Sequence, residues 1–215
     1  MAVGVALSPI PIVAVVLMLV TPRARVNGPA FVLGWLVGLA VVGGIVLAVA
    51  GPTGASDESQ PAEWVDWLKI VLGALLLLVA LRQWRSRPHE GDEVATPKLF
   101  GAIDSFTPGK SLGAGALLAG VNPKNLLLAI GAAATIAQTG ISGGEQAVAY
   151  AVFALIGTLG VGAPVILYFA LGDRSRHMLD ELKTWMSRNN AAIMTVLCLV
   201  IGAKLIGDGI TGLSG

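Results

Sequence analysis

One short run places an ammonium and two carboxamides around a proline, inside an otherwise apolar stretch. The run is Asn122-Pro123-Lys124-Asn125, and mainly glycine, alanine and leucine flank it. A proline within a helix removes one backbone hydrogen bond and clashes with the preceding turn. A lysine at the centre of a bilayer costs about 2.5–3.5 kcal/mol on insertion scales, so such a residue is a candidate for function. We interpret Lys124 as a substrate-binding residue. The alternative is a lysine that snorkels or hydrogen-bonds the backbone exposed by the break.

The composition is that of an integral membrane protein. Hydrophobic residues make up 55% of the 215 residues and charged residues only 13%, and the mean hydropathy is +0.79. Soluble domains carry about 25% charged residues. The net charge of +1, without a basic stripe, argues against a nucleic-acid partner. Cys198 is the only cysteine, which excludes an intrachain disulfide and dithiol electron transfer.

Six apolar runs are long enough to cross a bilayer, which takes about 20 residues. Lysines and arginines gather in alternate connections between these runs, and only Lys69, Lys124 and Lys204 lie elsewhere. The positive-inside rule makes those connections cytoplasmic, so both termini are expected outside. The predicted spans are 2–20, 28–50, 66–84, 111–137, 146–171 and 190–210.

The two halves of the chain resemble each other weakly. Ser8-Pro9-Ile10-Pro11 in the first span is similar to the Asn122 run in the fourth, and both proline breaks are expected near the midplane. With three spans per half, the second copy must be inverted relative to the first, as in many secondary transporters. We predict an all-α membrane protein of six transmembrane helices in a 3+3 inverted repeat. Residues 1–84 form the first repeat, 85–110 a cytoplasmic linker and 111–215 the second repeat.

Three further segments have predicted roles. The stretch 86–97 is polar and expected to be mobile, whereas 99–110 has an apolar pattern that suits the membrane surface. The segment 174–188 has one apolar helical face and fits either an interfacial amphipathic helix or a solvated extension of the last span. The spacing Gly34-x-x-x-Gly38 is typical of close helix contacts, within one chain or in a homodimer.

Lys124 is the only charged residue expected deep within a span. Lys69 is near the outer interface and is expected to snorkel. Lys204 snorkels, pairs with Asp208 or binds the substrate. Cation transporters need intramembrane carboxylates or His/Cys clusters, and none falls in the middle of a span. A deep ammonium alone favours an anionic substrate, with no metal or cofactor. The predicted substrate-binding residues are Lys124, Asn122, Asn125, Pro123, Ser8, Pro9, Pro11 and Lys204.

The six spans, the Ser8-Pro9-Ile10-Pro11 start and the Asn122-Pro123-Lys124-Asn125-Leu126 run resemble the actinobacterial GAP/Sap family over essentially the whole chain. These are the glycopeptidolipid- and sulfolipid-addressing proteins of the LysE transporter superfamily. The resemblance implies movement of envelope lipids or glycolipids, with membrane lipids and envelope-lipid synthesis or export proteins as partners. Relatives that carry electrons use paired cysteines, which this chain lacks.

The leading hypothesis is a plasma-membrane (inner-membrane) flippase or exporter of an anionic lipid or glycolipid, with alternating access around a midplane site. Two alternatives stay open: a LysE-like exporter of a small anionic solute or amino acid, and a non-transporting scaffold for lipid export. No enzyme is expected, because neither a nucleophile–base pair nor a metal-ligand set can be assembled from the sequence.

Overall fold

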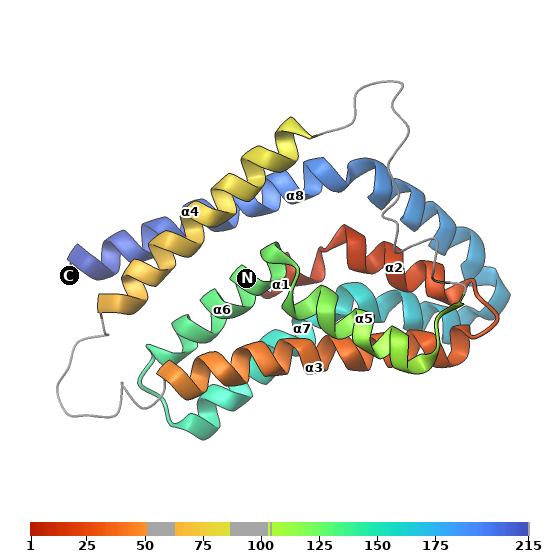
Figure 1. Cartoon of the computed structure of the whole chain (residues 1–215), viewed down its shortest axis with the longest axis horizontal. Helices are drawn as coiled ribbons and strands as arrows, with labels where there is room; N and C mark the ends of the chain where they lie inside the picture. The colour runs from red at the N-terminus through yellow and green to blue at the C-terminus, as the bar shows by residue number, and fades with distance from the viewer. Residues whose placement is uncertain (51–62, 87–102, 104, 215) are drawn as a thin grey trace.

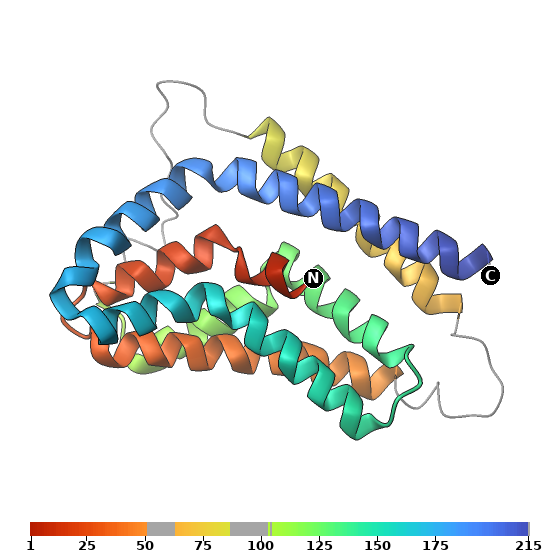
Figure 2. The ribbon, with the colours of Figure 1, turned by 180° about the vertical axis from the view of Figure 1, so that it is seen from behind.

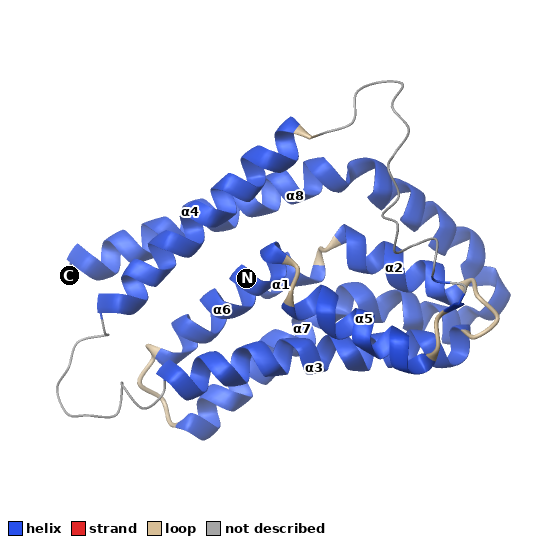
Figure 3. Cartoon of the chain, viewed as in Figure 1, coloured by secondary structure: helices blue, strands red, loops and turns tan. Residues whose placement is uncertain are grey.

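The chain is helical throughout the part that the structure describes. The computed structural model describes residues 1–50, 63–86, 103 and 105–214, and these ranges contain no strand (Figure 3). The predicted linker 85–110, with its polar stretch 86–97, lies mostly outside them. In chain order the helices are α1 (Ala2–Ala6), α2 (Pro9–Leu19), α3 (Ala24–Ala50), α4 (Glu63–Arg85), α5 (Pro108–Gly120), α6 (Pro123–Ala137), α7 (Gly143–Leu171), the 3-10 helix η3 (Gly172–Arg174) and α8 (Ser175–Ser214).

Several helices are suited to cross a membrane. Four are long and apolar enough by themselves, namely α3, α4, α7 and α8. A fifth candidate is the pair α5 and α6, which is bent by 65° at its break. The remaining predicted span, 2–20, divides into α1 and α2, and α2 has only 11 residues. The chain is therefore an all-α, multi-pass membrane protein with four or five candidate spans.

Prolines place the breaks in both divided helices. Pro9 and Pro123 are the first residues of α2 and α6, where the missing N–H removes no helical hydrogen bond. A residue before proline is disfavoured in the α conformation. Ser8 and Asn122 are accordingly extended, and each serves as the N-cap of the new helix. One helix therefore ends and another begins at each of these sites.

Two layers of helices build the molecule. In both views α4 and the later part of α8 lie side by side as one layer, and the other six α-helices form the second (Figures 1 and 2). The first part of α8 curves from the second layer to the first (Figures 1 and 2). The divided helices meet near the middle of the molecule, where the N-terminus also lies (Figure 1). From there α2 and α6 run towards opposite ends, and the C-terminus lies at the end that α6 approaches (Figure 1). The two breaks are thus at similar depth.

Glycines let the helix backbones approach closely. A Cβ added to Gly34 would lie 1.9 Å from the carbonyl oxygen of Leu112, so α3 and α5 pack backbone against backbone. Gly38 continues this contact one turn later. In the same way, a Cβ on Gly160 of α7 would lie 1.8 Å from the carbonyl oxygen of Ala6 in α1. The Gly34-x-x-x-Gly38 spacing therefore serves packing within one chain.

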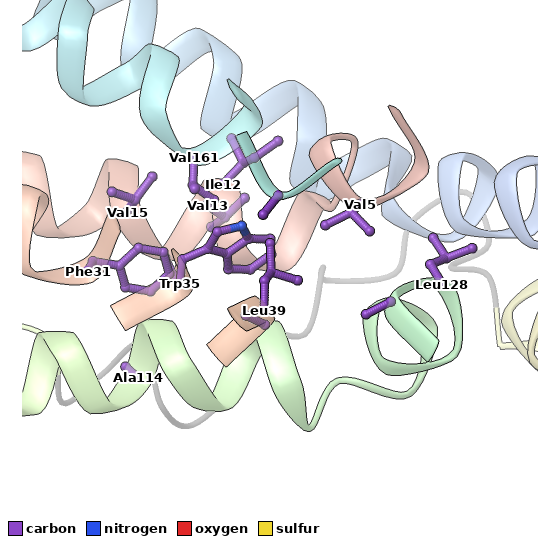
Figure 4. Packing of buried hydrophobic residues seen from close by; sticks show 14 of the residues in the cluster. Val5, Ile12, Val13, Val15, Phe31, Trp35, Leu39, Ala114, Leu128 and Val161 are labelled. Atoms are coloured by element: carbon purple, nitrogen blue, oxygen red, sulfur yellow. The ribbon is translucent and has the colours of Figure 1, made fainter. Parts of the chain in front are cut away.

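The hydrophobic core lies beside the first break. Trp35 of α3 is fully buried and stacks against Phe31 with 6.5 Å between ring centroids. Leu39 and valines of α2 and α7 surround it, and Val5 of α1 belongs to the same cluster (Figure 4). The short helix α1 is therefore anchored to the core by its side chains.

The segment 174–188 belongs to the same helix as the last predicted span. Gly172, with a φ of 55°, ends α7, and after η3 the helix α8 runs without interruption to Ser214. Leu179 and Met186 from the predicted apolar face are buried, whereas Trp185 is exposed. The first part of α8 is thus an extension of the last span that packs only partly on the protein.

Candidate functional site

Ser8, Lys124 and Asn125 form a buried polar cluster where the two helix breaks meet. Their exposed fractions are 1%, 1% and 0%. Ser8 lies at the α1–α2 break, and the other two lie in the first turn of α6. The Nζ of Lys124 donates to Ser8 Oγ at 2.7 Å, and Ser8 Oγ is 2.8 Å from Asn125 Oδ1, to which it can donate. The structure thus brings together three of the predicted site residues from distant parts of the sequence.

The ammonium of Lys124 also satisfies the end of α1. It donates to the carbonyl oxygens of Gly4 at 2.5 Å and Leu7 at 3.3 Å. A continuous helix would pair Leu7 with the N–H of residue 11, but that residue is a proline. The extended backbone of Ser8 likewise stops the helix before Gly4 is paired. All three donors of the ammonium are therefore used inside the protein.

Ser8 and Asn125 also lie against carbonyls left by the breaks. The Val5 carbonyl, which Pro9 cannot pair, lies 2.8 Å from Ser8 Oγ, whose single proton goes either to this carbonyl or to Asn125 Oδ1. The Nδ2 of Asn125 donates to the carbonyl of Leu118 near the end of α5, at 3.1 Å. An unpaired buried polar group costs about 1–3 kcal/mol. The cluster therefore stabilises both breaks at once.

The remaining predicted site residues at the breaks shape the helices. Asn122 caps α6, since its Oδ1 accepts from the backbone N–H of Lys124 at 3.2 Å. Pro9, Pro11 and Pro123 have no N–H to donate and lie in the first turns of α2 and α6. These four residues are beside the cluster, and they determine where its carbonyls are left unpaired.

Two other lysines within candidate spans form ion pairs. Lys204 is 65% exposed in its side chain and pairs with Asp208, and no described contact joins it to the cluster. Lys69 pairs with Asp66 at 3.0 Å, and both are buried, with exposed fractions of 8% and 3%. Gln138, the residue that follows α6, also donates to Asp66, at 3.3 Å. The expectation that Lys69 snorkels is wrong, because a carboxylate one turn away neutralises it inside the protein.

This buried pair is the polar feature that the sequence analysis missed. Its signal was present, since Asp66 and Lys69 are three positions apart and so share a helix face. Their place at the edge of an apolar run suggested an interfacial position instead. The Asp66–Lys69 pair joins α4 to the C-terminal end of α6 through Gln138, whereas the helix break at Asn122 is at the N-terminal end of α6.

Lys124 differs from these lysines in its partners. Among the described residues no carboxylate forms an ion pair with it, and it contacts two carbonyls and a hydroxyl. Within the described ranges no three His, Cys, Asp or Glu side chains gather as metal ligands would. A buried ammonium held only by neutral groups can gain energy from a mobile anion.

An apolar groove leads along α5 to the second break. Its volume is about 600 Å³, and Lys110 and Asn122 lie at its two ends. Between them the wall is apolar. It consists of Gly113, Ala114, Leu117 and Leu118 of α5, of Val121, which follows α5, and of Ile10 and Phe106. A smaller groove of about 360 Å³ lies on the other side of the same break, between α4 and α6.

A comparison with protein families agrees with this architecture. The model of the family described as Sap, sulfolipid-1-addressing protein, matches residues 1–211. The chain belongs to the Sap family. Comparisons with curated proteins and with solved structures found no match. The matched region of this Sap protein includes both helix breaks and the whole polar cluster. Its apolar helices and family place it among membrane proteins concerned with lipid addressing.

Proposed function

We propose that this Sap-family protein moves an anionic lipid or glycolipid of the cell envelope across the plasma membrane, as a flippase or exporter. The observation that carries the proposal is the fully buried Lys124, which joins two helix breaks without a described carboxylate partner. Charged groups inside a membrane protein commonly mark a substrate pathway. The family description refers to a sulfolipid, and an acidic sulfur group on a lipid is an anion.

In this proposal Lys124 couples head-group binding to movement of α1. An anionic head group competes with the carbonyls of Gly4 and Leu7 for the ammonium. In a low-dielectric interior an ion pair is stronger than the contact between the same ammonium and a neutral carbonyl. Binding therefore frees the end of α1, and Ser8 and Asn125 offer further polar atoms to the head group. A ligand shifts a conformational equilibrium by this kind of difference in affinity.

We infer that the halves α1–α4 and α5–α8 form a 3+3 inverted repeat, with both termini outside. Reciprocal packing supports this: a Cβ on Gly73 would lie 2.7 Å from the carbonyl oxygen of Gly202, and one on Gly202 would lie 2.9 Å from that of Gly73. The first helix of each half also packs on a glycine of the long helix in the other half, α5 on Gly34 and α1 on Gly160. Rocking of one repeat against the other then gives alternating access.

The groove along α5 favours a lipid over a small soluble anion or amino acid. Between Lys110 and Asn122 its wall offers only apolar side chains. A hydrophilic solute would lose water there without gaining hydrogen bonds, which is unfavourable. An acyl chain is apolar and loses no hydrogen bonds to water when it enters this groove.

Reconstituted protein tests the proposal. Vesicles contain phosphatidylglycerol with a fluorescent acyl chain, and a membrane-impermeant reductant destroys the fluorescence of the outer leaflet. We expect the unchanged protein to expose the inner-leaflet probe and Lys124→Met, which keeps the chain length without the charge, to lose this movement. Lys183→Met, on the first part of α8, is the matched control and should move the probe normally.

Folding of each variant is checked by gel filtration in detergent. Lys124→Arg keeps the positive charge and is expected to keep part of the movement. Normal lipid movement by folded Lys124→Met would rule out the proposed site. A folded unchanged protein that moves no probe would instead favour the scaffold hypothesis.

A further inference from the structure

We infer that the groove along α5 holds one acyl chain of an anionic lipid, whose head group lies at Lys110. The inference rests on the proposed lipid transport and names the place where the substrate first binds, before it reaches the polar cluster. The lipid comes from the leaflet at the Lys110 end of the groove.

The length of the groove fits one leaflet. Along α5 the groove runs from Lys110 to Val121, the residue that follows the helix. Eleven residues of helix correspond to roughly 17 Å at 1.5 Å per residue. The hydrocarbon core of a bilayer is about 30 Å thick. Figure 1 shows α5 running from one end of the molecule to its middle, so the groove extends through about half of the membrane.

Small side chains create the space. A Cβ added to Gly113 meets no atom within 4 Å, so nothing from the protein fills the groove at this point. Leu117 and Val121 are exposed and provide branched apolar atoms along its edge. Phe106, which precedes α5, also lines the groove, and its carbonyl accepts from Asn27 Nδ2 of α3 at 3.0 Å. The groove therefore has open space at Gly113, and the hydrogen bond from Asn27 ties Phe106 to α3.

Lys110 determines which lipid the groove prefers. Apolar contact alone gives little preference, because lipid tails are as apolar as leucine side chains. A lysine near a membrane surface attracts anionic lipid with an effect of about fivefold in binding. Lys110 is exposed in the first turn of α5, and no described carboxylate pairs with it. Charge complementarity therefore favours an anionic lipid over a zwitterionic one.

The other end of the groove leads to the proposed transport site. It stops at Asn122, whose side chain caps α6 through the backbone N–H of Lys124. A lipid in the groove therefore has its chain end against the α5–α6 break. A movement that opens this break would bring the lipid towards Lys124.

Photo-crosslinking tests the groove directly. The full chain is reconstituted in phosphatidylcholine vesicles that contain phosphatidylglycerol with a diazirine near the end of one acyl chain. After illumination, mass spectrometry of the digested protein locates the labelled residues. We expect labelling on α5 between residues 113 and 121, reduced about fivefold by Lys110→Gln. A phosphatidylcholine probe should label more weakly and be insensitive to Lys110→Gln.

A steric variant tests the same groove without changing charge. Gly113→Trp fills the groove and should block labelling by both probes, as should the smaller Gly113→Leu. Gly44→Trp is the matched control, because a Cβ at this exposed glycine of α3 also meets no atom within 4 Å. It should leave α5 labelling unchanged.

The outcomes separate this inference from the proposed function. Labelling of α5 that neither Lys110→Gln nor Gly113→Trp reduces would overturn the groove site. Lipid movement without any labelling of α5 would also remove the groove site and leave the transport proposal standing. Groove labelling that responds to both variants, in a protein that moves no lipid, would support the groove site and remove transport.

Discussion

At the scale of single residues, the hydroxyl of Ser8 holds the polar cluster together. It accepts from Lys124 and faces the Val5 carbonyl, which Pro9 leaves unpaired. We predict that Ser8→Ala lowers the free energy of unfolding by about 1–3 kcal/mol, because buried polar groups lose their partners. Unfolding of the purified protein in detergent, followed by circular dichroism, measures the change.

Ser214→Ala is the matched control for this prediction. The Ser214 hydroxyl likewise lies against the carbonyl three residues earlier, that of Thr211, to which it donates at 3.1 Å, but in an exposed position. Water can replace that bond, so the change should stay within roughly 0.5 kcal/mol. Equal losses in the two variants would contradict the view that burial makes the Ser8 contacts important.

The sequence indicated several members of the cluster but not their partners. A proline and a lysine within an apolar run indicated a helix break, and the structure has one at Asn122. The structure also places Ser8 beside Lys124. The carbonyls of Gly4 and Leu7 were not predictable, because any backbone oxygen has the same chemistry and only the fold decides which one lies near the ammonium.

At the scale of whole helices, glycine contacts decide how closely the divided helices pack. A Cβ on Gly160 would meet the backbone oxygen of Ala6 at 1.8 Å, and a backbone atom cannot move aside as a flexible side chain can. We predict that Gly160→Ala separates α7 from α1 and lowers the free energy of unfolding by about 1–3 kcal/mol. The thermal midpoint in detergent should fall accordingly.

Gly162→Ala, on the same helix, provides the comparison. The nearest atom to a Cβ at Gly162 is the Cγ2 of Thr158 at 3.9 Å, which is an ordinary contact. Alanine is the better helix former by roughly 0.5–1 kcal/mol, so this variant should keep or raise the midpoint. A midpoint for Gly160→Ala that matches the Gly162→Ala value would show that α1 can shift without loss.

Hydropathy predicted where the helices lie in the sequence better than it predicted the residues at which they begin and end. The predicted spans 28–50, 66–84 and 146–171 lie within α3, α4 and α7. The span 190–210 is part of a helix that starts at Ser175, because the periodicity of 174–188 is the same in an interfacial helix and in an extension. The break in 2–20 falls between Ala6 and Pro9, since a proline acts on the residues before it.

At the scale of the whole molecule, the layers could not be predicted from hydropathy. The pairing of α4 with α8 depends on the mutual approach of Gly73 and Gly202, and that of α3 with α5 on Gly34 against Leu112. Single-sequence patterns mark these glycines as contact points but do not say which helix each one meets. Charge, in contrast, does predict an orientation, because loops of opposite membrane faces differ in lysine and arginine content.

The orientation can be tested with single cysteines. Thr139 lies in the turn between α6 and α7, and His177 lies near the start of α8; Figure 1 places these two segments at opposite ends of the molecule. Glu145 is the only charged residue between Lys124 and Asp173, so the connection at Thr139 contains no lysine or arginine. By contrast, Arg174, Lys183 and Arg188 lie on both sides of His177 in the sequence. The positive-inside rule therefore predicts that Thr139 is outside and His177 is cytoplasmic.

The measurement uses a membrane-impermeant maleimide on intact cells and on opened cells. Cys198 is buried and is first changed to alanine, so that each added cysteine is the only thiol. We expect Thr139→Cys to react in intact cells and His177→Cys to react only after the cells are opened. Reaction of His177→Cys in intact cells would reverse the assigned orientation. The start of α5, which carries Lys110, lies at the same end of the molecule as the start of α8, which carries His177 (Figure 1). The same result therefore decides the leaflet from which a lipid would enter, because the Lys110 end of the groove is on the same side as His177.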